Sequence, residues 1–258
     1  RLLRQAATRR GVPLIWDVDD AVWTLSESRR RLAEAQAREA DLVVAGNQYL
    51  ADWSESIGTP SIILPTCAPT LSSPLDKSHQ SIRLLWLGSP ATQRYLRQIA
   101  EQLAIFLKET PDAHLDVIGA ALPEQLQGLE NALSLPWTPD NERRALRTAH
   151  AGLSPQPRGS WEDGKCGFKV IQYLAHGLIP IVSDVPQHRQ ILDELGIRVP
   201  SQGEWLDALR SFSAQGDSRA AHAAACLGRA QAHFDISVGA TRWAQLLRFP
   251  EITPCEMS

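Results

Sequence analysis

The stretch that decides the fold spans residues 161–182 and reads WEDGKCGFKVIQYLAHGLIPIV. Apolar side chains recur at helical spacing from residue 165 and stop at Gly177, which predicts an amphipathic helix over 165–176. The apolar run over 178–182 then predicts a buried strand. A helix that leads directly into a buried strand is the repeating unit of a parallel α/β sheet.

The predicted helix carries a polar stripe that begins with two of the four lysines of the chain. At the helical angle per residue, Lys165, Lys169, Gln172 and His176 fall within about 60° of one another. Free N–H groups and the positive end of the helix dipole favour an anion at the start of a helix, and two ammonium groups add to this. The stripe is therefore either a phosphate site or a solvated polar face.

Short apolar runs alternate with amphipathic stretches along the rest of the chain, which predicts a parallel α/β architecture. Strands are expected at 13–18, 41–45, 61–64, 83–87, 114–118, 152–154, 178–182 and 197–199. Helices are expected at 25–39, 47–57, 91–109, 123–132, 140–149, 165–176 and 186–195. Residues 202–249 read as helical, with breaks near Gly216 and near 235–237.

A stretch rich in proline, serine and threonine at 65–81 predicts a linker between two domains. We expect a first domain over 1–68, a linker over 69–81, a second domain over 82–235, and a C-terminal helix and tail over 236–258. The first domain has about three strands, too few for a doubly wound sheet. The chain also starts without methionine, in what reads as a helix, so we expect a fragment lacking most of its N-terminal domain.

Composition excludes several classes of protein. With 258 residues, 43% of them hydrophobic and 21% charged, the chain has the composition of a globular protein. The net charge of −3 argues against a general nucleic-acid binder, which needs a basic surface. The four cysteines form no CxxC pair, which argues against zinc and for free thiols. No apolar run in the sequence has the length of a membrane span.

An apolar strand that ends in Asp17-Val18-Asp19 admits two enzymatic chemistries. In a haloacid-dehalogenase-like phosphatase, Asp17 would be the nucleophile and Asp19 the general acid beside Mg²⁺. In one class of glycosyltransferases, a DxD motif holds a metal under the sugar diphosphate. Alternatively, Asp19 and Asp20 cap the helix that follows.

Four further residues are candidate ligand contacts. Gly88 and Ser89 follow the strand at 83–87, where a glycine turn lets a ligand approach the backbone closely. Trp137 precedes a helix and either lines a pocket for a base or ring, or belongs to the core. His188 follows a turn and either faces a ligand or is an exposed residue at a helix start.

Taken in order, these segments resemble bacterial family-4 glycosyltransferases. The resemblance rests on DVDDAVW at 17–23, ADLVVAGNQYL at 40–50, LPT at 64–66, WLGSP at 86–90, PW at 136–137, GLSP at 152–155, residues 161–177, and Phe234 with TRW at 241–243. It covers nearly the whole chain, and residues 161–177 are its most specific part.

The resemblance implies the GT-B fold, in which two Rossmann-like domains face a cleft. Residues 1–68 would be the end of the acceptor-side domain, and 82–235 the domain that binds the nucleotide-sugar donor. Such enzymes retain the configuration of the sugar and need no metal or other cofactor. The implied donor is a UDP- or GDP-sugar, and the acceptor is an unknown carbohydrate or lipid-linked molecule. A role in surface-polysaccharide synthesis, a cytoplasmic location and at most peripheral membrane contact would follow. A non-catalytic nucleotide-sugar-binding module is the alternative.

Carried over by position, the resemblance implies donor-binding residues at Gly88, Ser89, Trp137, Lys165, Cys166, Gly167, Phe168, Lys169 and Gln172. The first two would face the diphosphate, the lysines would neutralise it, and Gln172 would reach the ribose. Two departures concern glutamates of the family, which are replaced here by Gly164 and Gln172. An amide can still bond a ribose hydroxyl, but glycine cannot replace a carboxylate. Glu162 or Asp163 would therefore have to act as the catalytic carboxylate.

Overall fold

The computed structural model describes residues 2–77 and 81–248. Residues 78–80 of the expected linker and 249–258 of the expected tail lie outside this range. The chain forms two compact units. The first comprises Arg1–Cys67, Arg158–Cys166 and Ile236–Ser258, and the second comprises Ala68–Pro157 and Gly167–Asp235. The short segment 158–166 therefore belongs to the first unit although both of its neighbours in sequence belong to the second.

The first unit is built on a three-stranded parallel sheet in the order β1-β2-β3. Its elements are α1 (Leu2–Arg10), β1 (Ile15–Val18), η1 (Val22–Thr24), α2 (Glu27–Glu39), β2 (Leu42–Ala45), α3 (Gln48–Ser56), β3 (Ser61–Ile63) and α11 (Ile236–Arg248). Ser26 and Asn47 cap α2 and α3, each accepting a backbone N–H of the first turn. Trp23 stacks on Trp53 with the ring centroids 3.7 Å apart, in the core of this unit.

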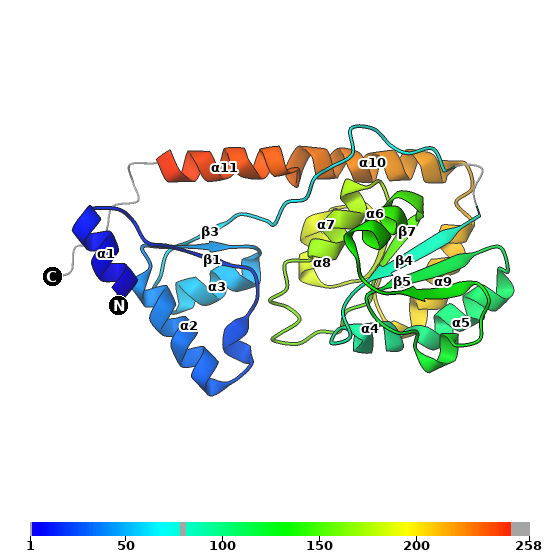
Figure 1. Cartoon of the computed structure of the whole chain (residues 1–258), viewed down its shortest axis with the longest axis horizontal. Coiled ribbons are helices and arrows are strands. Elements are labelled where there is room, and N and C mark those ends of the chain that lie inside the picture. The colour runs from blue at the N-terminus through cyan, green and yellow to red at the C-terminus, as the bar shows by residue number, and fades with distance from the viewer. Residues whose placement is uncertain (1, 78–80, 249–258) are drawn as a thin grey trace. The chain divides into compact units, whose positions relative to one another are not determined.

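The second unit is a six-stranded parallel sheet in the order β6-β5-β4-β7-β8-β9. Its strands are β4 (Arg83–Leu87), β5 (His114–Ile118), β6 (Ala132–Leu135), β7 (Ala151–Ser154), β8 (Ile179–Ser183) and β9 (Ile197–Val199). Its helices are α4 (Gln93–Arg97), α5 (Ala100–Glu109), η2 (Glu124–Leu126), α6 (Pro139–Thr148), α7 (Phe168–Ala175), α8 (Pro186–Leu192), η3 (Gln202–Glu204), α9 (Trp205–Ser213) and α10 (Ser218–His233). They cover both faces of the sheet (Figure 1).

Alternation along β4 explains why both faces are covered. Leu84 and Trp86 lie in the larger core cluster, whereas Leu85 and Leu87 lie in the smaller cluster of the opposite face. Side chains of successive strand residues point to opposite faces, so a strand that is apolar throughout has to be buried on both. The expected α/β fold class is confirmed.

Three predicted helices differ from the structure. The helix expected at 123–132 is wrong: only η2 forms, Gly128 takes a φ of +80°, and residues 132–135 join the sheet as β6. The helix expected at 91–109 is divided into α4 and α5, because the buried Ile99 leaves the helical conformation. The helix expected at 165–176 begins only at Phe168.

The late start of α7 has a local cause at Gly167. This residue takes a left-handed conformation with φ of +65°, which ends the helical path toward lower residue numbers. A Cβ at this position would lie 2.4 Å from Cδ1 of Ile191, so only glycine fits. Lys165 therefore lies before the helix, and the stripe predicted for α7 keeps Lys169, Gln172 and its C-cap His176.

Candidate functional site

Strand order places the candidate site of the second unit. The chain starts at the central β4, adds β5 and β6 on one side, and then adds β7, β8 and β9 on the other. This is the doubly wound order in which ligands bind beyond the carboxyl ends of the strands, where the direction of winding reverses. The crevice is thus expected beyond the ends of β4 and β7, close to Gly88.

Gly88 is required by its surroundings. A Cβ there would lie 1.9 Å from the indole of Trp86, so any side chain would displace this buried tryptophan. Gly119 follows β5 with φ of +89°, and a Cβ on it would lie 2.2 Å from the carbonyl oxygen of Gly88. Two backbones therefore approach each other closely at the ends of β4 and β5. Glycine is therefore needed at the ends of both strands for this packing.

Ser89 is exposed at the turn that follows. Its backbone N–H donates to the Thr92 hydroxyl at 3.0 Å, which closes the turn before α4. The helix α4 has only five residues, which is too short for an anion site at its start. The contribution of Ser89 to diphosphate binding stays a prediction.

Lys169 lies in the first turn of α7, with Nζ 4.9 Å from the ring centroid of Trp86. Trp86 in turn contacts Gly88, so the ammonium group is at the carboxyl end of β4. Tyr173 holds α7 in place: its hydroxyl accepts the Leu87 N–H at 3.1 Å and donates to the Leu153 carbonyl at 3.2 Å. Burial raises the pKa of this phenol, which therefore stays neutral.

A second group of polar side chains links α6, α7 and the loop after β6. Glu142 accepts hydrogen bonds from the Trp137 indole N–H and from Gln172 Nε2, the latter at 3.0 Å. A carboxylate offers acceptors only, so the amide nitrogen of Gln172 must face it. The Oε1 of Gln172 bonds to no described residue and is the atom left to accept a hydroxyl proton. Trp137 is 58% exposed, so its alternative assignment to the core is wrong.

The remaining residues predicted to contact the ligand differ in their exposure. Phe168 is 45% exposed at the start of α7, and Gly167 forms the N-cap beside it. His188 is fully buried, which contradicts the expectation of an exposed residue. Its Nδ1 lies 2.8 Å from the Ser183 carbonyl, and burial lowers its pKa to about 4, so the neutral ring donates this bond.

Four predicted site residues lie in the first unit, on the segment 158–166. Lys165 pairs with Asp20 at 3.5 Å, and its Nζ lies 4.6 Å from the ring centroid of Trp161. Burial raises the pKa of Asp20 more than this pair lowers it. The Asn47 amide donates to the Lys165 carbonyl at 3.0 Å, which fixes the segment to the cap of α3.

Cys166 is a half-buried hydrogen-bond donor rather than a nucleophile. Its thiol donates to the Asp19 carbonyl at 3.0 Å. Burial, followed by the charges of Asp19, Asp20 and Asp17, raises the pKa of the thiol to about 12. The thiolate is therefore scarce at neutral pH. Any contact of Cys166 with the nucleotide-sugar donor would come from its neutral thiol or its backbone.

The two acidic residues expected to replace the missing glutamate are held within the same segment. Asp163 forms a two-bond ion pair with Arg158 at 2.9 and 3.1 Å. Glu162 Oε2 lies beside Gly159, 2.5 Å from where a Cβ would be. Gly164, where the resemblance implies a glutamate, has no room for a side chain, because a Cβ there would lie 2.3 Å from Cβ of Ala21. The catalytic assignment of Glu162 and Asp163 stays a prediction.

Two residues of this region were not expected from the sequence. Gly119 follows the strand at 114–118, and the same reasoning that singled out Gly88 applies to it. Glu142 is an acidic residue in the first turn of α6, a position that a carboxylate stabilises without any ligand. Its contact with Gln172 spans 30 residues, and only the folded chain shows it.

Neither a protein-family model nor a curated protein sequence matches the chain. Solved structures do. HepE of Anabaena in complex with UDP and glucose matches with a TM-score of 0.77 and 15% identity, over 95% of this chain and 74% of its own. Sucrose-phosphate synthase from Thermosynechococcus elongatus matches with 0.73 and 16%, over 95% and 69%. The pneumococcal O-GlcNAc transferase GtfA, in complex with UDP and GlcNAc, matches with 0.69 and 14%, over 95% and 54%.

These likenesses extend over almost the whole described chain and concern the fold. Both sheets are parallel, both are flanked by helices, and the second has the doubly wound strand order. Among the described residues, no helix is long and apolar enough to cross a membrane. The chain therefore has the Rossmann-like GT-B fold of nucleotide-sugar glycosyltransferases.

Proposed function

We propose that this chain is part of a retaining, metal-independent family-4 glycosyltransferase whose second unit binds a UDP- or GDP-sugar. The observation that carries the proposal is the position of Lys169 beside Trp86 and Gly88, at the reversal of the doubly wound sheet. Its fold neighbours were solved with UDP, with UDP and glucose, and with UDP and GlcNAc.

The proposed reaction breaks the bond between the anomeric carbon of the donor and its diphosphate oxygen. The bonding electrons leave with the nucleoside diphosphate, a new bond forms to an acceptor hydroxyl oxygen, and that hydroxyl loses its proton. Lys169 and the N–H groups of the first turn of α7 would stabilise the charge on the leaving diphosphate. Lys165 would contribute only after giving up its bond to Asp20.

The nucleoside would lie near the group formed by Trp137, Glu142 and Gln172. Gln172 replaces the glutamate of the family, but Glu142 orients its amide so that Oε1 accepts a hydrogen bond. A ribose hydroxyl is a suitable donor for that atom. Glu142, which contacts Gln172, thus carries the negative charge that is missing at position 172. We extend the proposal to a cytoplasmic enzyme of surface-polysaccharide synthesis, with at most peripheral membrane contact.

The test is calorimetric binding of UDP and GDP to Lys169→Ala. We expect an affinity at least tenfold lower, because one close charge on the diphosphate is lost. Lys108→Ala is the matched control, since Lys108 is an exposed lysine of the same unit. Unchanged affinity in Lys169→Ala would contradict the assignment.

Two assays separate the alternatives. Binding of UDP without release of UDP from any UDP-sugar would favour a non-catalytic nucleotide-sugar-binding module. Mg²⁺-dependent release of phosphate from p-nitrophenyl phosphate, abolished by Asp17→Asn, would instead favour the phosphatase. Donor turnover that continues in excess EDTA would support metal independence.

A further inference from the structure

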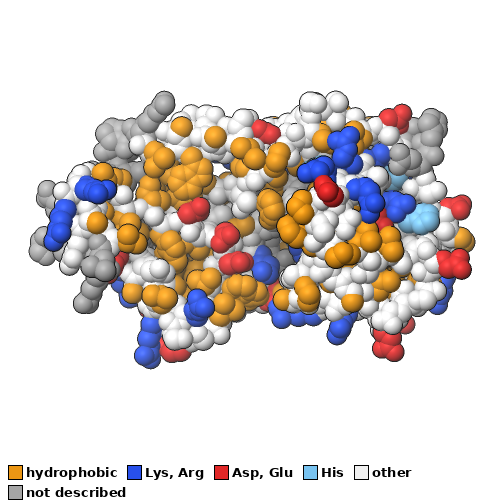
Figure 2. Space-filling view, in the orientation of Figure 1, with side chains coloured by type: hydrophobic (Ala, Val, Ile, Leu, Met, Phe, Trp, Pro, Cys, Tyr) orange, Lys and Arg blue, Asp and Glu red, His pale blue; other side chains and the backbone are white. Residues whose placement is uncertain are grey.

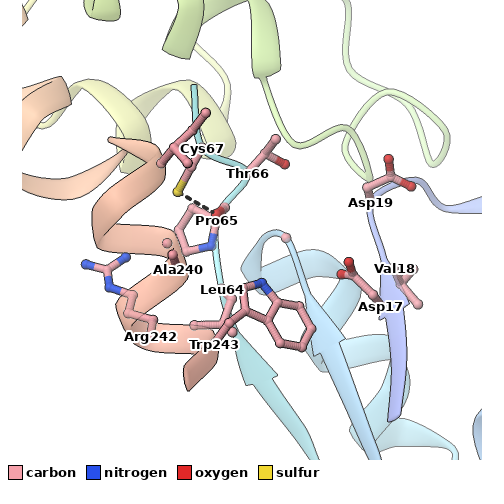
Figure 3. A pocket seen from close by; sticks show the side chains of 13 residues that line it. Asp17, Val18, Asp19, Leu64, Pro65, Thr66, Cys67, Ala240, Arg242 and Trp243 are labelled. Atoms are coloured by element: carbon pink, nitrogen blue, oxygen red, sulfur yellow. Dashed lines mark hydrogen bonds between the residues drawn. The ribbon is translucent and has the colours of Figure 1, made fainter. Parts of the chain in front are cut away.

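The first unit contains a cavity of about 530 Å³ that the donor site does not use. It lies where β1 and β3 end and α11 begins, and its lining includes Asp17, Asp19, Leu64, Thr66, Arg242 and Trp243 (Figure 3). Cavities of this size are typical of small-molecule sites. The carboxyl ends of parallel strands are also where such sites form.

A close packing contact lets α11 approach the chain that leaves β3. A Cβ on Gly239 would lie 2.7 Å from Sγ and 3.3 Å from Cβ of Cys67, so glycine is needed for the contact. Gly46, which follows β2, is needed for the same reason, because a Cβ there would lie 2.2 Å from Sγ of Cys166. Both glycines therefore allow close packing between the segments that line the cavity.

Acidic side chains outnumber basic ones in the lining of the cavity. Asp17 and Asp19 have no cationic partner among the described residues, and Arg242 is the single cation that lines the cavity. Figure 3 shows the Asp17 carboxylate turned toward Trp243, while the guanidinium of Arg242 points away from both aspartates. Burial and the charge of Asp19 raise the pKa of Asp17 above its ordinary value. A further negative charge in this cavity would be repelled.

The opposite wall is apolar. The indole of Trp243 lies beside Leu64, and the half-exposed Ile236 also lines the cavity. In the view of Figure 2, acidic side chains lie among hydrophobic ones on the visible face of the first unit. A flat indole opposite carboxylate acceptors suits a ligand with one apolar face and a rim of hydroxyl donors. A pyranose ring has this shape.

We propose that this cavity binds an uncharged glycoside, which is the acceptor of the transfer proposed above. Asp17 accepts hydrogen bonds from its hydroxyl groups, and Trp243 packs against the ring. The excess of carboxylates selects against acceptors that carry a phosphate or a uronate. The role of this glycoside as the acceptor rests on the proposed function, whereas its binding to the cavity is tested separately.

The experiment measures binding of matched glycosides to the chain by titration calorimetry. The probes are the methyl glycosides of glucose, galactose, mannose and N-acetylglucosamine, each beside its uronate or 6-phosphate counterpart. We expect at least one uncharged glycoside to bind at least tenfold more tightly than its charged counterpart. Asp17→Asn should weaken the uncharged ligand about tenfold, because a hydrogen bond to a charged group is lost.

Charge selectivity distinguishes this role from a structural one. Asp17→Asn should also lower the ratio of the affinity for the uncharged glycoside to that for its charged counterpart. A loss of folding would not change this ratio. Asp52→Asn removes an exposed carboxylate of the same unit and should change neither value. Binding of UDP to the second unit, measured in the same samples, should be unchanged in both variants.

Three results would overturn the inference. One is equal affinity for the charged and uncharged members of every pair, and another is an unchanged ratio in Asp17→Asn. The third is the absence of binding by every uncharged glycoside at millimolar concentration in a protein that binds UDP. If UDP itself does not bind, the proposed donor site fails, and the glycoside titrations still decide whether the cavity binds sugars.

Discussion

At the scale of single residues, several glycines are required by close contacts within the chain. Gly88 makes room for the Trp86 ring at the end of β4, and Gly119 makes room for the Gly88 carbonyl. Gly167 is the residue after which α7 begins. Gly164 has a different role, because it brings segment 158–166 against Ala21. A glutamate at this position would have to displace that contact.

The contact at Gly164 gives a prediction about stability. Gly164→Ala should lower the free energy of unfolding by about 1–3 kcal/mol, because the added methyl group overlaps Ala21. Ala21→Gly removes the opposing methyl group, so the double variant should recover part of the loss. Urea denaturation of the two single variants and the double variant measures both effects. Strictly additive losses would show that the two positions are not in contact.

At the scale of elements, helix starts decide which charges reach the candidate site. Because α7 begins at Phe168, Lys169 is in its first turn, whereas Lys165 is outside it and pairs with Asp20. Behind this helix, α8 buries His188 beside Gly167. The buried ring couples the stability of the second unit to pH.

The folded-state pKa of His188 is lowered to about 4, whereas an unfolded chain has a value of about 6.5. Between these values the unfolded state takes up a proton that the folded state does not. The free energy of unfolding should therefore fall as the pH drops from about 6.5 to 4, by on the order of 3 kcal/mol from this residue.

His188→Gln should flatten this dependence. Urea denaturation at about pH 7 and pH 5 measures how far the free energy of unfolding falls with pH in the variant and in the unchanged chain. Burial also lowers the pKa of His150 and His176, so the unchanged chain will lose stability in acid for several reasons. Only the difference between the two proteins belongs to His188, and equal slopes would contradict the prediction.

At the scale of the whole molecule, each unit has a hydrophobic core of its own. The core of the first unit is centred on Trp23 and its neighbours, and the second unit has one cluster on each face of its sheet. A ligand that binds one folded unit should stabilise that unit by mass action. UDP is expected to act on the second unit.

At a concentration of about 100 times its dissociation constant, UDP should stabilise the second unit by about 2.7 kcal/mol. For a unit of this size, the melting temperature should rise by roughly 5–10 °C in scanning calorimetry. With a tenfold weaker affinity, Lys169→Ala should show about half the stabilisation at the same UDP concentration. An equal rise in both proteins would place the nucleotide away from Lys169.

Much of the second unit was predictable because its strands are buried on both faces. Such strands are apolar throughout, and most of their boundaries agree within one or two residues. The strand β6 was not predictable, since only four residues pair and Leu122, Leu126 and Leu129 repeat at helical spacing. The wrong start of α7 has the same origin, because periodicity does not show that Gly167 takes a positive φ.

The sequence by itself determined the parallel α/β class and the polar stripe of 169–176. Both depend on apolar periodicity and on caps, which are local properties of the chain. Only the tertiary structure decided that segment 158–166 belongs to the first unit, that Lys165 pairs with Asp20, and that Glu142 orients Gln172. These contacts join residues 30 to 145 positions apart, and such pairings are set by packing. The helix periodicity was enough to propose a phosphate site, whereas the lack of room for a side chain at Gly164 could not be anticipated from the sequence.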